Sequence, residues 1–166
     1  MIGTGYVGLT TGACFAHLGH KVTCADVVEA KVDSLQRGEI PIHEAGLEEL
    51  VRAGVGNGNL SFVLGSEKAV RDAEFVYLCV PTPQTAEGSA DLRYLIAAAK
   101  QISPHLRPGT VVVNKSTVPV GSTLLVEQAL GRSDIPVVSN PEFLREGSAV
   151  DDFLHPDRVV IGSEDR

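Results

Sequence analysis

Two acidic residues four positions apart, Glu142 and Glu146, flank the Phe-Leu-Arg sequence at 143–145 and could take part in acid–base chemistry. If this segment is helical, both carboxylates lie on one face, because residues four apart are neighbours on a helix. Two carboxylates at the end of a strand can divide their roles, one as general base and one as hydrogen-bond acceptor. The alternative is a solvated acidic helix face, which is the commoner reason for such a pair.

Two further polar clusters directly follow apolar runs. The run at 75–80 leads into a Pro-Thr-Pro sequence centred on Thr82, whose prolines fix the chain direction. The run at 110–113 leads into an Asn-Lys-Ser-Thr sequence that ends at Thr117, too early to cap a helix starting near Gly121. Open α/β sheets bind ligands at the carboxyl ends of their strands, so both threonines are candidate site residues. A bare proline loop and ordinary helix capping are the respective alternatives.

The start of the chain carries a glycine pattern that binds phosphate when a helix follows it. Gly3, Gly5 and Gly8 fit GxGxxG. In this pattern Gly3 permits a tight turn, Gly5 lets the backbone approach a pyrophosphate, and Gly8 lets the helix pack closely on the sheet. The helix N-terminus then offers free N–H groups to the phosphate.

An acid follows the glycine pattern at the distance typical of dinucleotide sites. Asp26 lies 18 residues after Gly8, at the end of an apolar run at 21–25. An acid there binds the adenosine ribose and repels a 2′-phosphate. Because Val27 and Val28 stand where an NADP site has a basic residue, the sequence predicts NAD as the cofactor. A plain strand–turn–helix with a surface acid is the alternative.

The candidate residues need elements that bring strand ends together. Apolar, β-branched runs predict strands at 21–25, 61–64, 75–80, 110–113, 136–138 and 158–161. Helical patterns occupy 6–18, 28–36, 44–53, 92–102 and 121–130. This alternation predicts an α/β fold with a doubly wound, mostly parallel, Rossmann-like sheet. Only Met1 and Ile2 precede Gly3, so the first strand is expected to be truncated.

Composition narrows the class of protein further. The 166 residues are 43% hydrophobic and 21% charged, which suits one ordinary globular domain. A net charge of −7 without a basic run argues against nucleic acid or an anionic membrane as partner. The longest apolar run, at 75–80, is six residues long, and no signal peptide opens the chain. We therefore expect a cytoplasmic protein.

Cysteine and histidine give no sign of chemistry. Cys14, Cys24 and Cys79 lie among apolar neighbours and lack CxxC spacing, which favours inert core residues and a reducing compartment. His17 and His20 are three apart at a helix end, but no third ligand is near. No metal site is predicted.

Five motifs, in order along nearly the whole chain, resemble the N-terminal NAD-binding domain of the UDP-glucose/GDP-mannose dehydrogenase family. They are GTGYVG at 3–8, CVPTP at 79–83, KSTVPVG at 115–121, NPEFLREG at 140–147 and HPDRVVIG at 155–162. GDP-mannose relatives usually have VGTP in place of VPTP, and N-acetylmannosamine relatives have a PER-type sequence in place of PEFLRE. Both differences favour UDP-glucose, with GDP-mannose or another UDP-sugar as the alternative.

The resemblance implies oxidation of the sugar's C6 alcohol to a carboxylate, giving UDP-glucuronate, with two NAD and one water. It implies that the adenosine diphosphate half of NAD is held by Tyr6, Val7, Asp26 and Lys31. Thr82 and Thr117 would border the nicotinamide ribose, with Thr117 also ordering a catalytic water.

The segment at 142–146, called the acidic segment below, would then face the substrate. The resemblance implies that Glu142 activates water for thioester hydrolysis and that Glu146 contacts NAD. The residues along the sugar nucleotide would be Glu142, Phe143, Leu144 and Arg145.

Residues 1–166 would form the NAD-binding domain, as a fragment without the later domains that carry the family's cysteine nucleophile. The isolated chain is therefore expected to be inactive, with UDP-glucose, the remainder of the enzyme and identical copies in a homo-oligomer as partners. A non-catalytic NAD-binding module is the alternative from another class. A 2-hydroxy-acid dehydrogenase would need a His–acid pair, which we do not find.

Overall fold

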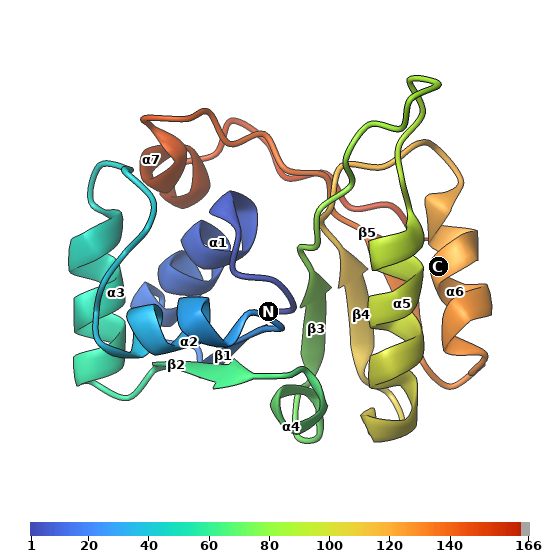
Figure 1. Ribbon diagram of the computed structural model, residues 1–166, viewed down its shortest axis with the longest axis horizontal. Coiled ribbons are helices and arrows are strands. Elements are labelled where there is room, and N and C mark those ends of the chain that lie inside the picture. The colour runs from blue at the N-terminus through green and yellow to red at the C-terminus, as the bar shows by residue number, and fades with distance from the viewer. Residues whose placement is uncertain (164–166) are drawn as a thin grey trace.

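The computed structural model describes residues 1–163 and has an α/β fold in which parallel strands alternate with helices (Figure 1). The strands are β1 (Val22–Asp26), β2 (Leu60–Leu64), β3 (Phe75–Leu78), β4 (Val111–Asn114) and β5 (Val137–Ser139). The helices are α1 (Tyr6–His17), α2 (Glu29–Gln36), α3 (Leu47–Gly56), α4 (Glu67–Val70), α5 (Arg93–Ile102), α6 (Ser122–Leu130) and α7 (Ala149–Leu154), with a short 3₁₀ helix η1 (Ser103–His105).

Two residues at the start of the chain join the two groups of strands. β1 pairs in parallel with β2, and β3, β4 and β5 pair in parallel with one another. Ile2 lies between the groups and forms parallel bridges to Ala25 and Leu78. The Ile2 N–H donates to the Tyr77 carbonyl, and the Ala25 N–H donates to the Met1 carbonyl, both at 2.8 Å. The order β2-β1-(1–2)-β3-β4-β5 is that of a doubly wound sheet, and its first strand is as short as expected.

Helices cover both faces of this sheet. Neighbouring residues of a strand point to opposite faces, so they pack in different clusters. Ala25 and Leu78 pack in one buried cluster with α5 and α6. Their neighbours Cys24 and Cys79 pack in the other cluster with α1, α2 and α3. The three predicted inert cysteines are buried, and burial raises their pKa values, to about 11 for Cys24 and about 12 for Cys14 and Cys79.

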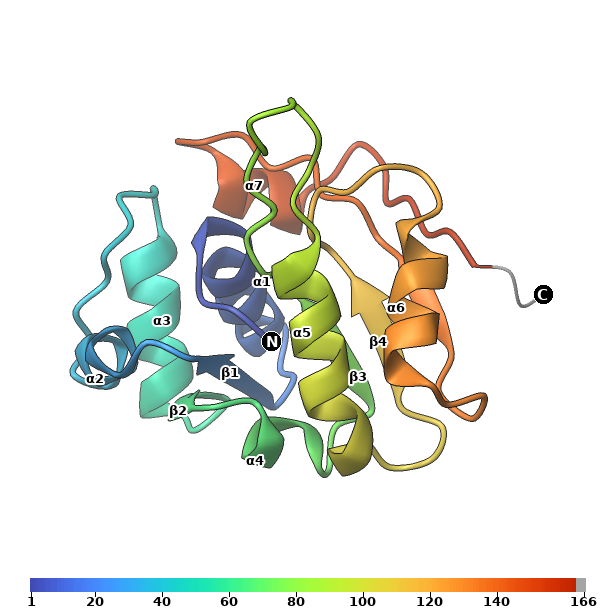
Figure 2. The same cartoon turned by 45° about the vertical axis from the view of Figure 1, so that its right-hand side comes forward.

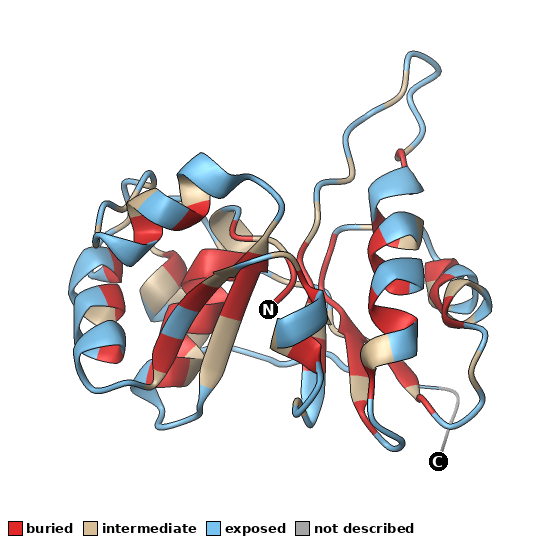
Figure 3. Cartoon of the chain, turned by 60° about the horizontal axis from the view of Figure 1, so that its bottom comes forward, coloured by how far each residue is buried: buried red, intermediate tan, exposed pale blue. Residues whose placement is uncertain are grey.

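A cavity of about 540 Å³ opens between β1 and β3 beside the start of the chain. Thr23 and Tyr77, from the two facing strands, line it together with Met1. The Met1 ammonium donates to the Thr23 carbonyl at 2.7 Å. Figure 3 shows the buried strand positions on either side of the N-terminus. The centre of the sheet is therefore closed only at its carboxyl end.

The predicted strand at 158–161 is wrong. This segment is irregular, and only Gly162 forms an antiparallel bridge, with Ser139. Its apolar residues resembled a buried strand, yet Val159 and Ile161 are 66% and 67% exposed. The β-branched pattern at 158–161 therefore corresponds to an exposed apolar surface and not to a buried strand.

Element boundaries shifted where glycine adopts the left-handed conformation. α3 begins at Leu47 and not at Glu44, because Gly46 has φ 78°. α4, η1 and α7, with three to six residues each, were missed because such short elements show no apolar period.

Within residues 1–163, no helix is long and apolar enough to cross a membrane. The same residues contain no cluster of three or more potential metal ligands.

Candidate functional site

A cleft of about 570 Å³ lies at the carboxyl ends of the central strands. It is lined by eight of the predicted site residues: Gly3, Gly5, Tyr6, Val7, Asp26, Lys31, Thr82 and Thr117. α5 forms another wall, through Tyr94 and Ala98, and Figure 2 shows this helix in front of β3. The structure thus brings together residues separated by more than a hundred positions in the chain.

The glycine turn at the floor of this cleft is tight at two positions and open at the third. A Cβ added to Gly8 would lie 2.0 Å from the Gly3 carbonyl oxygen, and one added to Gly3 would lie 2.5 Å from that of Cys79. A Cβ on Gly5 would meet nothing within 4 Å. Packing therefore requires Gly3 and Gly8, whereas Gly5 leaves space over the turn.

The N-terminus of α1 faces this space without a capping side chain. Gly5 is its N-cap, and no side chain caps the first turn, which also contains no acidic residue. The first N–H groups of a helix lack intrahelical acceptors and carry partial positive charge. Together with the open surface at Gly5, this arrangement can accept a pyrophosphate.

Asp26, at the end of β1, binds the turn from the side. Its Oδ2 accepts hydrogen bonds from the Thr4 N–H at 2.9 Å and the Thr4 hydroxyl at 2.6 Å. Its Oδ1 accepts from the N–H groups of Val27 at 2.8 Å and Val28 at 3.1 Å. Burial raises the pKa of Asp26, but the hydrogen bonds from Thr4, Val28 and Lys31 outweigh it and lower the pKa to about 2. Asp26 is thus ionised, and it also holds the shape of the turn.

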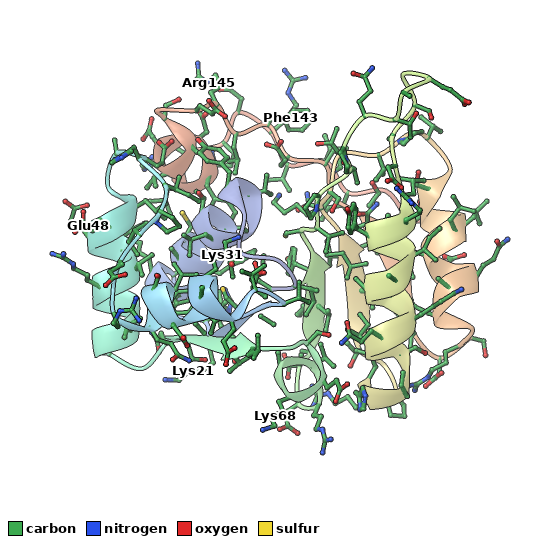
Figure 4. The ribbon with its side chains drawn as sticks, in the orientation of Figure 1. Lys21, Lys31, Glu48, Lys68, Phe143 and Arg145 are labelled. Atoms are coloured by element: carbon green, nitrogen blue, oxygen red, sulfur yellow. The ribbon has the colours of Figure 1, made fainter. Side chains whose placement is uncertain are left out.

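Lys31 makes the one contact to Asp26 that comes from a long side chain. Its Nζ lies 3.1 Å from Asp26 Oδ2, and its side chain is 30% exposed against 10% for Asp26. Figure 4 labels Lys31, which α2 contributes to the cleft. Because a lysine side chain is flexible, this contact can be exchanged for a ligand more easily than the four from Thr4, Val27 and Val28.

The two predicted threonines are linked directly. The Thr82 hydroxyl donates to the Thr117 carbonyl at 2.7 Å and so joins the loops after β3 and β4. Ser116 reinforces the link, since its hydroxyl donates to the Val80 carbonyl at 2.9 Å. Thr117 itself is exposed. One threonine therefore holds the loop, and the other presents its side chain at the rim of the cleft.

Lys115 lies buried behind this rim. Its Nζ donates to Asn140 Oδ1 at 3.2 Å. Burial lowers the pKa of Lys115, while the charge of Glu142 acts in the opposite direction. The acidic segment therefore begins within electrostatic reach of a buried cation.

The conditional helix at 142–146 is wrong, so Glu142 and Glu146 share no helix face. The segment is irregular up to a turn before α7. The Leu144 N–H donates to Glu142 Oε2 at 2.7 Å, and this local bond satisfies a donor that a helix would otherwise use. In Figure 1 the segment crosses above α1 on its way to α7.

Two of the predicted substrate residues, Phe143 and Arg145, are exposed at the surface. Phe143 is 58% exposed, and Figure 4 shows it and Arg145 projecting outward at the upper edge. The Arg145 guanidinium pairs with Asp152 at 2.5 Å, and this pairing lowers the pKa of Asp152 to about 2. These residues do not line the 570 Å³ cleft, so their role stays a prediction.

Sequence reasoning missed Glu44, which lies between the glycine turn and the acidic segment. Glu44 Oε2 accepts from the Tyr6 hydroxyl at 2.6 Å and from the Gly147 N–H at 2.8 Å. Its Oε1 accepts from the Ala149 N–H at 2.9 Å. The Tyr6 hydrogen bond lowers the pKa of Glu44, whereas burial and Glu44 raise the pKa of Tyr6. No local pattern could reveal contacts with residues 38 and 103 positions away.

The whole chain, residues 1–166, matches the model of a family described as "UDP-glucose/GDP-mannose dehydrogenase family, NAD binding domain". It is 50% identical over 168 residues to the UDP-glucose 6-dehydrogenase TuaD of Bacillus subtilis and 47% identical over 171 residues to a UDP-glucose 6-dehydrogenase of Pseudomonas aeruginosa. The matches cover 98% of this chain but only 36% and 38% of those relatives.

Solved structures agree with this relationship. A UDP-glucose dehydrogenase from Pyrobaculum islandicum superposes with a TM-score of 0.93 at 45% identity, over 99% of this chain and 40% of that one. A GDP-mannose dehydrogenase from Pseudomonas aeruginosa, solved as a ternary complex, superposes with a TM-score of 0.90 at 36% identity, over 98% of this chain and 40% of that one.

Proposed function

This chain belongs to the UDP-glucose/GDP-mannose dehydrogenase family as its NAD binding domain, and from that premise we propose that it is the cofactor half of an enzyme that oxidises UDP-glucose at C6. The observation that carries the proposal is the cleft in which Gly5, Asp26, Thr82 and Thr117 meet. The cofactor is NAD, which when bound supplies the hydride acceptor.

The turn and Asp26 fit the two ends of an adenosine diphosphate. Gly5 and the uncapped start of α1 would take the pyrophosphate. Asp26 would accept a ribose hydroxyl in the place now taken by Lys31 Nζ, which would then turn toward the phosphates. Tyr6 and Val7, in the first turn of α1, would line the same half of the site.

The threonine pair would order the nicotinamide end. Thr82 would hold the loop through the Thr117 carbonyl, and the exposed Thr117 residue would hold the water used to hydrolyse the thioester. Glu146 would reach NAD from the acidic segment. In this reading two NAD and one water convert each C6 alcohol to a carboxylate.

Glu142 is proposed as the general base that activates this water. It begins the segment in which the exposed Phe143 and Arg145 and the half-buried Leu144 would lie along the sugar nucleotide. The buried Lys115 lies within electrostatic reach of Glu142. A carboxylate next to the Thr117 loop can take a proton from water held there.

The chain would work as one part of a larger, homo-oligomeric enzyme whose remaining domains supply the cysteine nucleophile. Large apolar side chains that are exposed in this chain support such contacts: Val120 is fully exposed, Phe143 is 58% exposed and Ile161 is 67% exposed. We therefore expect residues 1–166 alone to bind NAD without oxidising UDP-glucose.

Glu142→Gln in the full-length enzyme tests the proposed reaction. Both oxidations should proceed as far as the thioester, and its hydrolysis should slow by about 10²- to 10⁴-fold, the typical value of a general base. A covalent thioester should then accumulate in intact-protein mass spectrometry with UDP-glucose. The unchanged enzyme should release two NADH per UDP-glucose, and the exposed Glu87→Gln serves as the control. Normal steady-state rates in Glu142→Gln would contradict the assignment.

A further inference from the structure

Glu44 connects two parts of the site that the chain keeps far apart. One oxygen accepts the Tyr6 hydroxyl at 2.6 Å, at the first residue of α1 beside the glycine turn. The same carboxylate accepts the N–H groups of Gly147 at 2.8 Å and Ala149 at 2.9 Å, where the acidic segment enters α7. A single carboxylate therefore holds both the cofactor turn and the end of the acidic segment.

Two backbone N–H groups at the end of this segment, those of Gly147 and Ala149, have Glu44 as their acceptor. Ala149 is the first residue of α7, whose N-cap, Ser148, makes no capping hydrogen bond. The Ser148 hydroxyl bonds Asp152 instead, at 3.2 Å. Since the first N–H groups of a helix need acceptors from elsewhere, Glu44 serves as the cap of α7 from a distant loop.

Tyr6 adds a second link to the same segment. Its hydroxyl lies 3.1 Å from the Arg145 carbonyl as well as 2.6 Å from Glu44. A phenol carries one hydrogen, so the two oxygens compete for it, and the shorter bond goes to the ionised carboxylate. Any ligand that fixes the Tyr6 ring consequently fixes the position of Glu44.

We propose that Glu44 is a positioning residue that couples the occupancy of the cofactor turn to the order of residues 142–149. This inference rests on the proposed function, because it takes NAD as the ligand that fixes Tyr6. NAD bound at the turn orders the N–H groups of Gly147 and Ala149 through Tyr6 and Glu44. By reciprocity, an ordered segment binds NAD more tightly, so the sugar-facing residues are arranged when the cofactor is present.

Amide hydrogen exchange, resolved by NMR, tests the coupling on the 166-residue chain. Saturating NAD should slow exchange at Gly147 and Ala149 at least threefold. Tyr6→Phe keeps the ring and both backbone bonds to Glu44 but removes the link, so NAD should no longer slow these two amides. Glu44→Gln should exchange them faster even without NAD. Glu49→Gln, an exposed acid of α3, is the matched control and should behave as the unchanged protein.

Calorimetry separates the two ways in which the proposal can fail. If the unchanged chain does not bind NAD, the cofactor assignment fails and the coupling fails with it. If NAD binds and protects the two amides equally in Tyr6→Phe, the cofactor touches the segment directly and the coupling is wrong. If Glu44→Gln does not fold, Tyr6→Phe alone still decides, because a purely structural Glu44 leaves the effect of NAD unchanged in that variant.

Discussion

Asp26 combines two tasks that are usually separate: it fixes the glycine turn and it sets the charge that a cofactor meets. Its five hydrogen bonds come from Thr4, Val27, Val28 and Lys31. The spacing from the glycines made Asp26 predictable. Its dependence on Thr4 was not, because the residue between two glycines has no sequence signature.

Asp26 should make the chain select NAD over NADP. The ionised carboxylate repels a 2′-phosphate, although Lys31 at 3.1 Å offsets part of this charge. We expect NAD to bind at least tenfold more tightly, which corresponds to about 1.4 kcal/mol. Asp26→Asn should lower the ratio of NAD affinity to NADP affinity, whereas Asp33→Asn on the exposed side of α2 should leave this ratio unchanged. Calorimetry with both cofactors measures the two affinities, and equal affinities in the unchanged chain would contradict the assignment.

The same residue should give the domain an acid-sensitive stability. The folded state lowers the pKa of Asp26 from 3.8 to about 2, so its contribution is present above pH 4 and disappears as the pH falls toward 2. The shift corresponds to roughly 2 kcal/mol, since one pKa unit is worth about 1.4 kcal/mol. Urea unfolding at pH 7 and pH 2.5 measures the loss. Asp152 titrates in the same window, so the smaller loss expected for Asp26→Asn isolates the share of Asp26.

At the scale of elements, the start of α1 is built by two glycines for packing and by one for a ligand. Gly8 touches the Gly3 backbone, whereas Gly5 faces open space. Gly3, Gly5 and Gly8 are all glycines of the GxGxxG pattern, and only the fold shows that their roles differ.

Substituting alanine at Gly8 should therefore lower stability, whereas at Gly5 it should lower the affinity for NAD. Gly8→Ala places a Cβ 2.0 Å from a backbone oxygen, so α1 must shift, and a loss of about 3 kcal/mol or more is expected. Gly5→Ala meets nothing and φ is −70°, so stability should change by less than about 1 kcal/mol. Its Cβ would occupy the pyrophosphate position and weaken NAD binding at least tenfold. Thermal unfolding and calorimetry give both values, and unchanged NAD affinity in Gly5→Ala would place the phosphate elsewhere.

The sequence predicted those elements whose signals are local. The strands β1 to β5 and the longer helices follow apolar runs and periodicity within ten or so residues. Two predictions for the chain after β5 are wrong. Glu142 accepts a hydrogen bond within a local turn, where the sequence allowed a helix. The run at 158–161 resembles a buried strand but is exposed and irregular. Glu44 could not be found at all, since its partners are set by the path of the whole chain.

At the scale of the whole molecule, the two groups of strands are joined at the centre of the sheet by Met1 and Ile2. In the plane of the sheet, Met1 and Ile2 are the only described residues that lie between strands β1 and β3. The glycine turn follows directly on their carboxyl side. On their amino side lies the 540 Å³ cavity lined by Thr23, Phe75 and Tyr77. The turn that we assign to NAD therefore grows out of a two-residue bridge, and its rigidity depends on how firmly that bridge is held.

Extending the chain by five apolar, β-branched residues before Met1 should consequently change stability and cofactor binding together. The added strand would fill the cavity, pair with the backbones of β1 and β3, and bury side chains worth roughly 1.5–3 kcal/mol each. We expect the melting temperature to rise by about 5 °C or more. NAD should also bind more tightly, because Ile2 and the turn after it lose freedom before the cofactor arrives. A five-residue Gly-Ser extension is the matched control, since it offers backbone without side chains to fill the space. An equal gain from both extensions would trace the effect to the displaced Met1 ammonium, and a higher melting temperature with unchanged NAD affinity would separate the centre of the sheet from the turn.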